Sequence, residues 1–149
     1  MRFSIECALE EEDVNEEHPA LVAARSSWRC VQAKDKEGWL ALMADDVRIE
    51  DPIGVGPTNP TGEGIRGKAE VGDFYEKNIA ASKLHIDTHE SYVAGENESA
   101  HVLTLTSEFP NGIKTRVRGI FTYRLDDAGK LASLRGYWTM DDMKVEQPA

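Results

Sequence analysis

Asp51 is the acidic side chain whose position in this sequence best suits chemistry. It ends the alternating segment VRIED and is followed by Pro52 and the stretch IGVGPTNPTGEG, which is rich in glycine and proline. A carboxylate at the end of a strand, facing a loop, can act as a base when its surroundings withdraw it from water. The alternative is an exposed residue that only terminates the strand, because proline cannot continue a central ladder. The residues of this stretch alone leave both interpretations open.

Other reactive constellations are weak. His85 and His89 lie four residues apart in an alternating segment, where they share one side of a strand without a third metal ligand, and His101 is interpreted as a surface strand residue. Cys7 and Cys30 show neither metal-ligand spacing nor a disulfide framework, so we expect free thiols. No phosphate loop or serine–histidine pairing is present. We therefore expect no metal and no cofactor.

The charge of the chain is unevenly distributed. Of the net −10, −6 falls in residues 1–17, where seven acids face Arg2 alone. We expect residues 1–19 to form a disordered acidic tail rather than a binding segment. The negative balance of the remainder argues against nucleic acid, which needs a basic face. Without a long apolar run or a leader pattern, we expect a cytoplasmic protein with no membrane contact.

The remaining residues must position Asp51. Apolar spacing predicts helices over 20–35, 36–46 and 67–81, a strand at VRIED, and a long loop over 52–67 that suits a pocket rim. Four later segments alternate and are rich in β-branched and aromatic residues: KLHIDTHESYVAG, SAHVLTLTSEF, KTRVRGIFTYRL and LASLRGYWTM. Their separators GENE, PNG and DDAGK predict hairpin turns, with Asn111-Gly112 the clearest because both positions favour positive φ.

These elements predict an α+β fold in one domain. Residues 20–143 form that domain, and 144–149 form a short C-terminal tail. We expect a curved antiparallel sheet wrapped around three helices as a cone with one central cavity.

Three stretches of the chain resemble the bacterial ketosteroid isomerases. ALMADDVRIEDPIG is similar to the segment around the catalytic aspartate of that family. The FYEKN of the third helix and the hairpin YRLDDAGKLASLRGYW follow in the same order, so the resemblance covers about residues 20–140. The chain is identified as a mycobacterial-type member, within the superfamily that shares the nuclear-transport-factor and SnoaL-like cone. That superfamily also contains cyclases, epoxide hydrolases and non-enzymatic binders.

The resemblance implies a role for Asp51. In the family, an aspartate removes a proton next to a ketone and returns it two carbons away, while a tyrosine and a protonated aspartate hold the enolate oxygen. Asp51 matches this base, which favours the pocket interpretation, and Tyr75 matches a tyrosine that lines the pocket. The resemblance also implies a homodimer formed through the outer sheet face, although Arg116 and Arg118 on that face give it no firm support.

Both oxyanion donors of the family are absent at the matching positions. Ser27, beside Trp28, stands where the family has its tyrosine, and Phe121 stands where it has its protonated aspartate. Strand alternation offers Glu108 as a tentative replacement, because it shares a face with Val102, Thr104 and Thr106 that we expect to turn toward Phe121. An apolar setting would keep that carboxyl neutral and able to donate. A solvated residue near the hairpin turn is the favoured alternative.

An aromatic wall is the other predicted feature of the pocket. Its ring faces would suit a flat, apolar, fused-ring ligand such as a steroid. The indole N–H groups of Trp28 and Trp138 could also donate to a ligand oxygen. The predicted wall consists of Trp28, Phe74, Tyr75, Phe121, Tyr123 and Trp138.

The leading hypothesis is therefore a steroid delta-isomerase that moves the double bond of a 5-ene-3-keto steroid through Asp51. The absent donors favour a second hypothesis, a non-catalytic protein that binds a steroid or another small apolar molecule. A third hypothesis is another enzyme with this cone, an epoxide hydrolase or polyketide cyclase. We rank it low, because strand alternation turns Arg135 away from the face of Gly136 and Trp138.

Overall fold

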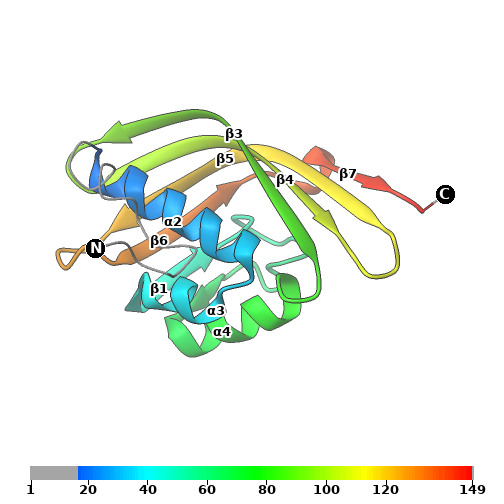
Figure 1. The fold of residues 1–149 in the computed structure, drawn as a ribbon, viewed down its shortest axis with the longest axis horizontal. Coiled ribbons are helices and arrows are strands. Elements are labelled where there is room, and N and C mark those ends of the chain that lie inside the picture. Colours follow the sequence, from blue (N-terminus) through cyan, green and yellow to red (C-terminus); the bar gives the residue numbers. More distant parts are fainter. Residues whose placement is uncertain (1–16, 149) are drawn as a thin grey trace.

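The computed structural model describes residues 17–148, so most of the predicted acidic tail lies outside the described residues. Figure 1 shows three helices packed against a strongly curved sheet. The elements are α2 (Pro19–Ala33), α3 (Lys36–Ala41), β1 (Met43–Glu50), β2 (Ile65–Arg66), α4 (Gly67–Asn78), β3 (Lys83–Ala94), β4 (Glu98–Glu108), β5 (Lys114–Leu125), β6 (Leu131–Tyr137), the 3-10 helix η1 (Met140–Asp142) and β7 (Met143–Glu146).

The sheet has seven strands in the order β2-β1-β6-β5-β4-β3, with β7 paired to β5. The predicted α+β class is confirmed, but the sheet is mixed rather than antiparallel throughout, because β1 runs parallel to β6. Parallel neighbours need a long crossover, and here the chain from β2 to β5 provides it. The C-terminal boundary expected at residue 143 falls inside β7, which pairs with the start of β5.

Two of the three predicted helices match closely, and the second is shorter than predicted. The His18 ring accepts a hydrogen bond from the Ala20 backbone and caps α2, whereas Lys34 ends that helix in the left-handed region with φ 61°. Asp35 caps α3, which stops at Ala41 instead of continuing to residue 46. Met43 belongs to β1, where its side chain is buried in the core.

The curvature of the sheet creates an inside. In Figure 1, β3, β4 and β5 arch over α2, while α3 and α4 lie on the far side of that helix. The inner faces of β4, β5 and β6 and the apolar side of α2 supply most of one buried cluster, which includes Trp28, Trp39, Leu103, Phe121 and Leu134. This arrangement matches the predicted cone, with the pocket between the helices and the sheet.

The hairpin between β4 and β5 has a register one residue away from the predicted one. A two-residue Asn111-Gly112 turn would place Glu108 opposite Thr115, but Glu108 pairs with Lys114. The Gly112 backbone N–H donates to the Phe109 carbonyl, and only Gly112 of the pair has positive φ, at 87°. The connection is thus a three-residue loop that ends in a left-handed glycine. A one-residue slip of this kind turns every side chain of β4 to the opposite face.

Two further expectations concern individual residues. Cys30 is buried and disulfide-bonded, so the prediction of a free thiol is wrong for this residue. Cys7 lies outside the described residues. Within residues 17–148, none of the helices has the length and apolar character needed to cross a membrane.

Candidate active site

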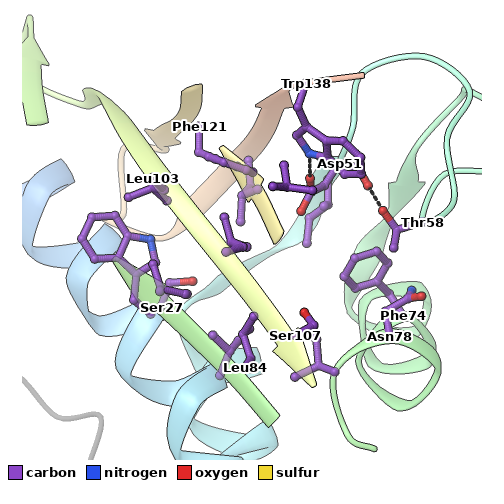
Figure 2. A pocket seen from close by; sticks show the side chains of 18 of the residues that line it. Ser27, Asp51, Thr58, Phe74, Asn78, Leu84, Leu103, Ser107, Phe121 and Trp138 are labelled. Carbon is purple, nitrogen blue, oxygen red and sulfur yellow. Dashed lines mark hydrogen bonds between the residues drawn. The ribbon is translucent and has the colours of Figure 1, made fainter. Parts of the chain in front are cut away.

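A cavity of about 310 Å³ lies between α2, α4, the inner face of the sheet and the loop that follows Asp51. This volume is at the lower end of the range of small-molecule sites. Figure 2 shows side chains from all of these elements converging on it. Most of the wall is apolar. The polar and charged members of the lining are Ser27, Asp51, Thr58, Lys77, Asn78, Ser107, Thr115 and Tyr123.

The alternation of β1 points Asp51 into this cavity. Val47 and Ile49 are buried on the inner face, and Asp51 is the next residue on the same side. Glu50 points the opposite way, where it accepts a hydrogen bond from Arg135 at 3.0 Å. Because Glu50 pairs with Arg135 in the parallel ladder, Asp51 comes to lie beside Gly136 of β6.

Gly136 provides the room that the Asp51 carboxylate needs. A Cβ atom at this position would lie 2.6 Å from Oδ1 of Asp51 and 3.0 Å from the Phe121 ring. No real side chain tolerates these distances without displacement of its neighbours. Glycine is therefore required here by close approach, because its φ lies outside the left-handed region.

The long loop after Asp51 is tied back onto the strands. The Thr58 hydroxyl donates to the Asp51 carbonyl (Figure 2), and the Ile53 backbone donates to the Gly136 carbonyl at 2.9 Å. The buried Asn59 amide donates to the Pro52 carbonyl and accepts from the Gly64 backbone. The loop thus forms part of the cavity rim, as its length suggested.

Two opposing effects determine the pKa of the Asp51 carboxylate. Burial raises its pKa to about 6, and a hydrogen bond from the Trp138 indole, 2.7 Å from Oδ1, lowers it in part. Figure 2 shows this bond at the cavity wall. A carboxylate with such a pKa is ionised at neutral pH and is a stronger base than an ordinary aspartate. This group can accept a proton from a ligand and return it.

The other two tryptophans also donate to polar groups of the cavity. Trp28 donates to the Tyr123 hydroxyl and Trp39 donates to the Ser27 hydroxyl, each at 2.9 Å. Burial raises the pKa of the Tyr123 phenol, the bond from Trp28 lowers it, and the charge of Asp51 raises it. Indoles therefore hold the carboxylate and two of the hydroxyls that face the ligand space.

The predicted aromatic wall is brought together except for one member. Trp28, Phe74, Phe121, Tyr123 and Trp138 all line the cavity. Tyr75 does not line it, because on α4 it is the residue after Phe74 and turns into the core, where its ring lies 5.9 Å from that of Trp39. The expectation that Tyr75 contacts the ligand is therefore corrected.

The one-residue slip of the hairpin overturns the prediction for Glu108. Glu108 is exposed on the outer face of β4 and does not line the cavity. The inner face carries Leu103, Leu105 and Ser107 instead. His101 also faces inward, so it is buried rather than a surface residue, and both ring nitrogens lie 2.7 Å from serine hydroxyls. Arg135 points outward, as predicted, so it does not contribute to a hydrolase site in this cavity.

Several polar residues at the rim were missed by the sequence. Ser107 enters the cavity only because of the hairpin register, and Thr58 only because the loop folds back over Asp51. Asn78 follows from α4, where it lies four residues after Phe74 and so shares its face. Helical spacing could have identified Asn78. No local pattern signals the other two.

The family model that describes the SnoaL-like domain matches residues 24–134, which is most of the chain. Solved structures agree with this match. RV0760c from Mycobacterium tuberculosis is 54% identical with a TM-score of 0.84, over 87% of this chain and 97% of that protein. The Delta 5-3-ketosteroid isomerase from a Mycobacterium species is 50% identical with a TM-score of 0.85, over 87% of this chain and 99% of that one.

A computationally designed 17-OHP binder is also similar, with 51% identity and a TM-score of 0.86 over 87% of this chain and all of that protein. The chain therefore belongs to the SnoaL-like domain family and, within it, is ketosteroid isomerase-like, as the sequence predicted.

Proposed function

We propose that this protein is a steroid delta-isomerase that moves the double bond of a 5-ene-3-keto steroid. The observation that carries the proposal is the Asp51 carboxylate, whose pKa is raised to about 6 in the wall of an apolar cavity. A base of this strength suits proton abstraction next to a ketone near neutral pH. The apolar walls suit the fused rings of the substrate.

The proposed reaction uses Asp51 twice. The ionised carboxylate takes a proton from the carbon between the ketone and the double bond, and the electron pair of that C–H bond forms a dienolate. The protonated carboxyl then returns the same proton to the far end of the former double bond, which yields the conjugated enone. Trp138 holds Oδ1 during both steps, so Oδ2 can carry the proton between the two carbons.

The relatives support a steroid as the ligand class. One is a mycobacterial Delta 5-3-ketosteroid isomerase, and another, RV0760c, has been solved in complex with estradiol-17beta-hemisuccinate. The designed relative binds 17-OHP. Three proteins at about half identity that share this cone are thus associated with steroids, which supports the same class of ligand here.

A second candidate function is steroid binding without turnover. It is favoured by Ser27 and Phe121, which occupy the positions of the family's two oxyanion donors. Losing one donor typically costs about 3 to 4 kcal/mol of transition-state stabilisation. A cavity without any donor would bind a steroid and isomerise it slowly.

Turnover of 5-androstene-3,17-dione separates the two functions. We expect the protein to produce the conjugated enone at a rate far above that in buffer. The ultraviolet absorbance of the enone measures this rate. No turnover above buffer, together with saturable binding of a planar phenolic steroid, would assign the protein to the binders. If neither turnover nor binding is observed, steroids are ruled out as the ligand class.

A further inference from the structure

The cavity contains two hydroxyl groups that are prepared to donate a hydrogen bond. Tyr123 and Ser27 each accept an indole N–H, from Trp28 and Trp39 respectively. A hydroxyl that accepts one hydrogen bond still has its own proton to give. Among the residues that the structure describes, no atom within hydrogen-bond reach accepts either proton. Both residues line the cavity, so a ligand oxygen is the acceptor available to their hydroxyls.

Tyr123 is the better placed of the two. It lies on β5, two residues beyond Phe121 and on the same inner face, and the charge of Asp51 acts on its phenol. A phenol is far more acidic than the alcohol of a serine, so it is the stronger donor to an enolate oxygen. Donor and base thus come from the two strands that flank β6, and both line one cavity.

The Tyr123 ring is held in place by other aromatic rings. Trp28 packs edge to face against it at 6.2 Å between centroids, and His101 does the same at 5.5 Å. His101 is itself fixed by hydrogen bonds to Ser91 and Ser99. A donor that is oriented before the substrate arrives loses little on reorganisation during the reaction, which is the property required of an oxyanion site.

We propose that Tyr123 is a catalytic residue that donates a hydrogen bond to the 3-keto oxygen of the steroid and to the dienolate formed from it. It supplies from β5 the function that Ser27 and Phe121 cannot supply at the family's positions. Trp28 acts as a positioning residue, because its N–H polarises the hydroxyl that donates. This inference rests on the proposed isomerase function.

The test compares Tyr123→Phe with Tyr75→Phe. Each variant removes the phenolic hydroxyl of a tyrosine whose side chain is largely buried, but Tyr75 lies outside the cavity lining. With 5-androstene-3,17-dione, Tyr123→Phe should lower kcat about 10²- to 10³-fold and leave KM nearly unchanged, because the bond strengthens in the transition state. Tyr75→Phe should retain kcat. Equal kcat values for the two variants would overturn the proposal.

A second measurement does not depend on turnover. In an Asp51→Asn background, the phenol of bound equilenin, a fluorescent planar steroid, should ionise at lower pH than in the Asp51→Asn/Tyr123→Phe double variant. The reason is that a donor stabilises the phenolate. An unchanged ionisation would overturn the role of Tyr123. If the wild type does not isomerise but this shift is present, the isomerase function fails while Tyr123 remains the donor to the ligand oxygen.

Trp28→Phe provides a variant that keeps the phenol. It removes the bond to the Tyr123 hydroxyl and leaves that hydroxyl in place. We expect a decrease in kcat in the same direction as for Tyr123→Phe but smaller, and a correspondingly smaller shift in the ionisation of bound equilenin. A decrease at Trp28 that equals the full loss at Tyr123, with no change in the ligand ionisation, would indicate only damaged packing and would contradict the proposal.

Discussion

The indole nitrogen of Trp138 lies 2.7 Å from Oδ1 of Asp51 and donates a hydrogen bond to it. The two residues come from different parts of the sheet and meet because Gly136, two residues before Trp138, leaves space for the carboxylate. The bond partly offsets the effect of burial on the pKa of Asp51. It also fixes one carboxylate oxygen, so the other is free to move a proton.

This bond predicts the pH dependence of the reaction. The rate, measured as kcat/KM, should rise with pH through about 6 and stay level above it, because only the ionised Asp51 is a base. Trp138→Phe removes the bond that lowers the pKa, so its acid limb should lie at higher pH. Steady-state rates from about pH 4.5 to about pH 8 measure both limbs. Coincident limbs would show that Trp138 does not tune the base.

Gly136→Ala should impair catalysis through the position of the carboxylate. The added methyl group would meet Oδ1 of Asp51 at 2.6 Å and the Trp138 indole nitrogen at 3.1 Å. A displacement of the base by about 1 Å can reduce the rate about 10²-fold. The matched control is Gly72→Ala on α4, where the nearest atom lies 3.7 Å away. It should keep full kcat and gain about 0.5–1 kcal/mol in the free energy of unfolding.

Asp51→Asn should stabilise the protein at neutral pH while it removes the base. The pKa of Asp51 rises from 3.8 to about 6 on folding, so its contribution to stability is present below about pH 4 and is lost as the pH rises through about 6. At about pH 8 the variant should gain roughly 2 to 4 kcal/mol in the free energy of unfolding. Urea unfolding measures this gain. A variant less stable than wild type at that pH would show that burial of the ionised carboxylate does not destabilise the fold.

His101 predicts a pH dependence of opposite sign. Burial, with the charge of Arg25, lowers its pKa from 6.5 to about 4, so its contribution is present above pH 6.5 and is lost as the pH falls through about 4. Between these limits wild type should lose on the order of 3 kcal/mol of its free energy of unfolding through His101. In His101→Gln, the free energy of unfolding should fall less steeply as the pH decreases over this range. Both proteins should be measured in the Asp51→Asn background, because Asp51 titrates over the same pH range. Equal slopes of the free energy of unfolding against pH, with and without His101→Gln, would contradict this prediction.

The helices and the end of the strand before Pro52 could be predicted because their signals are local. The apolar spacing of α2 and the alternation of VRIED before Pro52 predicted where each element begins or ends. An apolar helix face and a strand-ending proline can each be recognised from residues that lie close together in the sequence. This stretch alone left the direction of the Asp51 side chain open, and the resemblance to the ketosteroid isomerases favoured the pocket.

The other half of the cavity depends on one hairpin turn. Whether Pro110-Asn111-Gly112 forms a two- or three-residue connection decides which side of β4 faces inward, and propensity does not distinguish the two. The error moved Glu108 into the predicted site, left out Ser107 and placed the buried His101 on the surface. The indole bond to Tyr123 joins residues far apart in sequence, and the bond to Ser27 joins two successive helices, so no pattern within one element predicts them.

The most direct measurement is the rate of isomerisation of 5-androstene-3,17-dione by wild type, Asp51→Asn and Glu50→Gln. Glu50 is the matched control, because it is the adjacent acid and faces the outer side of the sheet, where it is paired with Arg135. We predict that Asp51→Asn loses turnover at least about 10²-fold while Glu50→Gln retains it. Equal turnover by wild type and Asp51→Asn would contradict the assignment of Asp51 as the base.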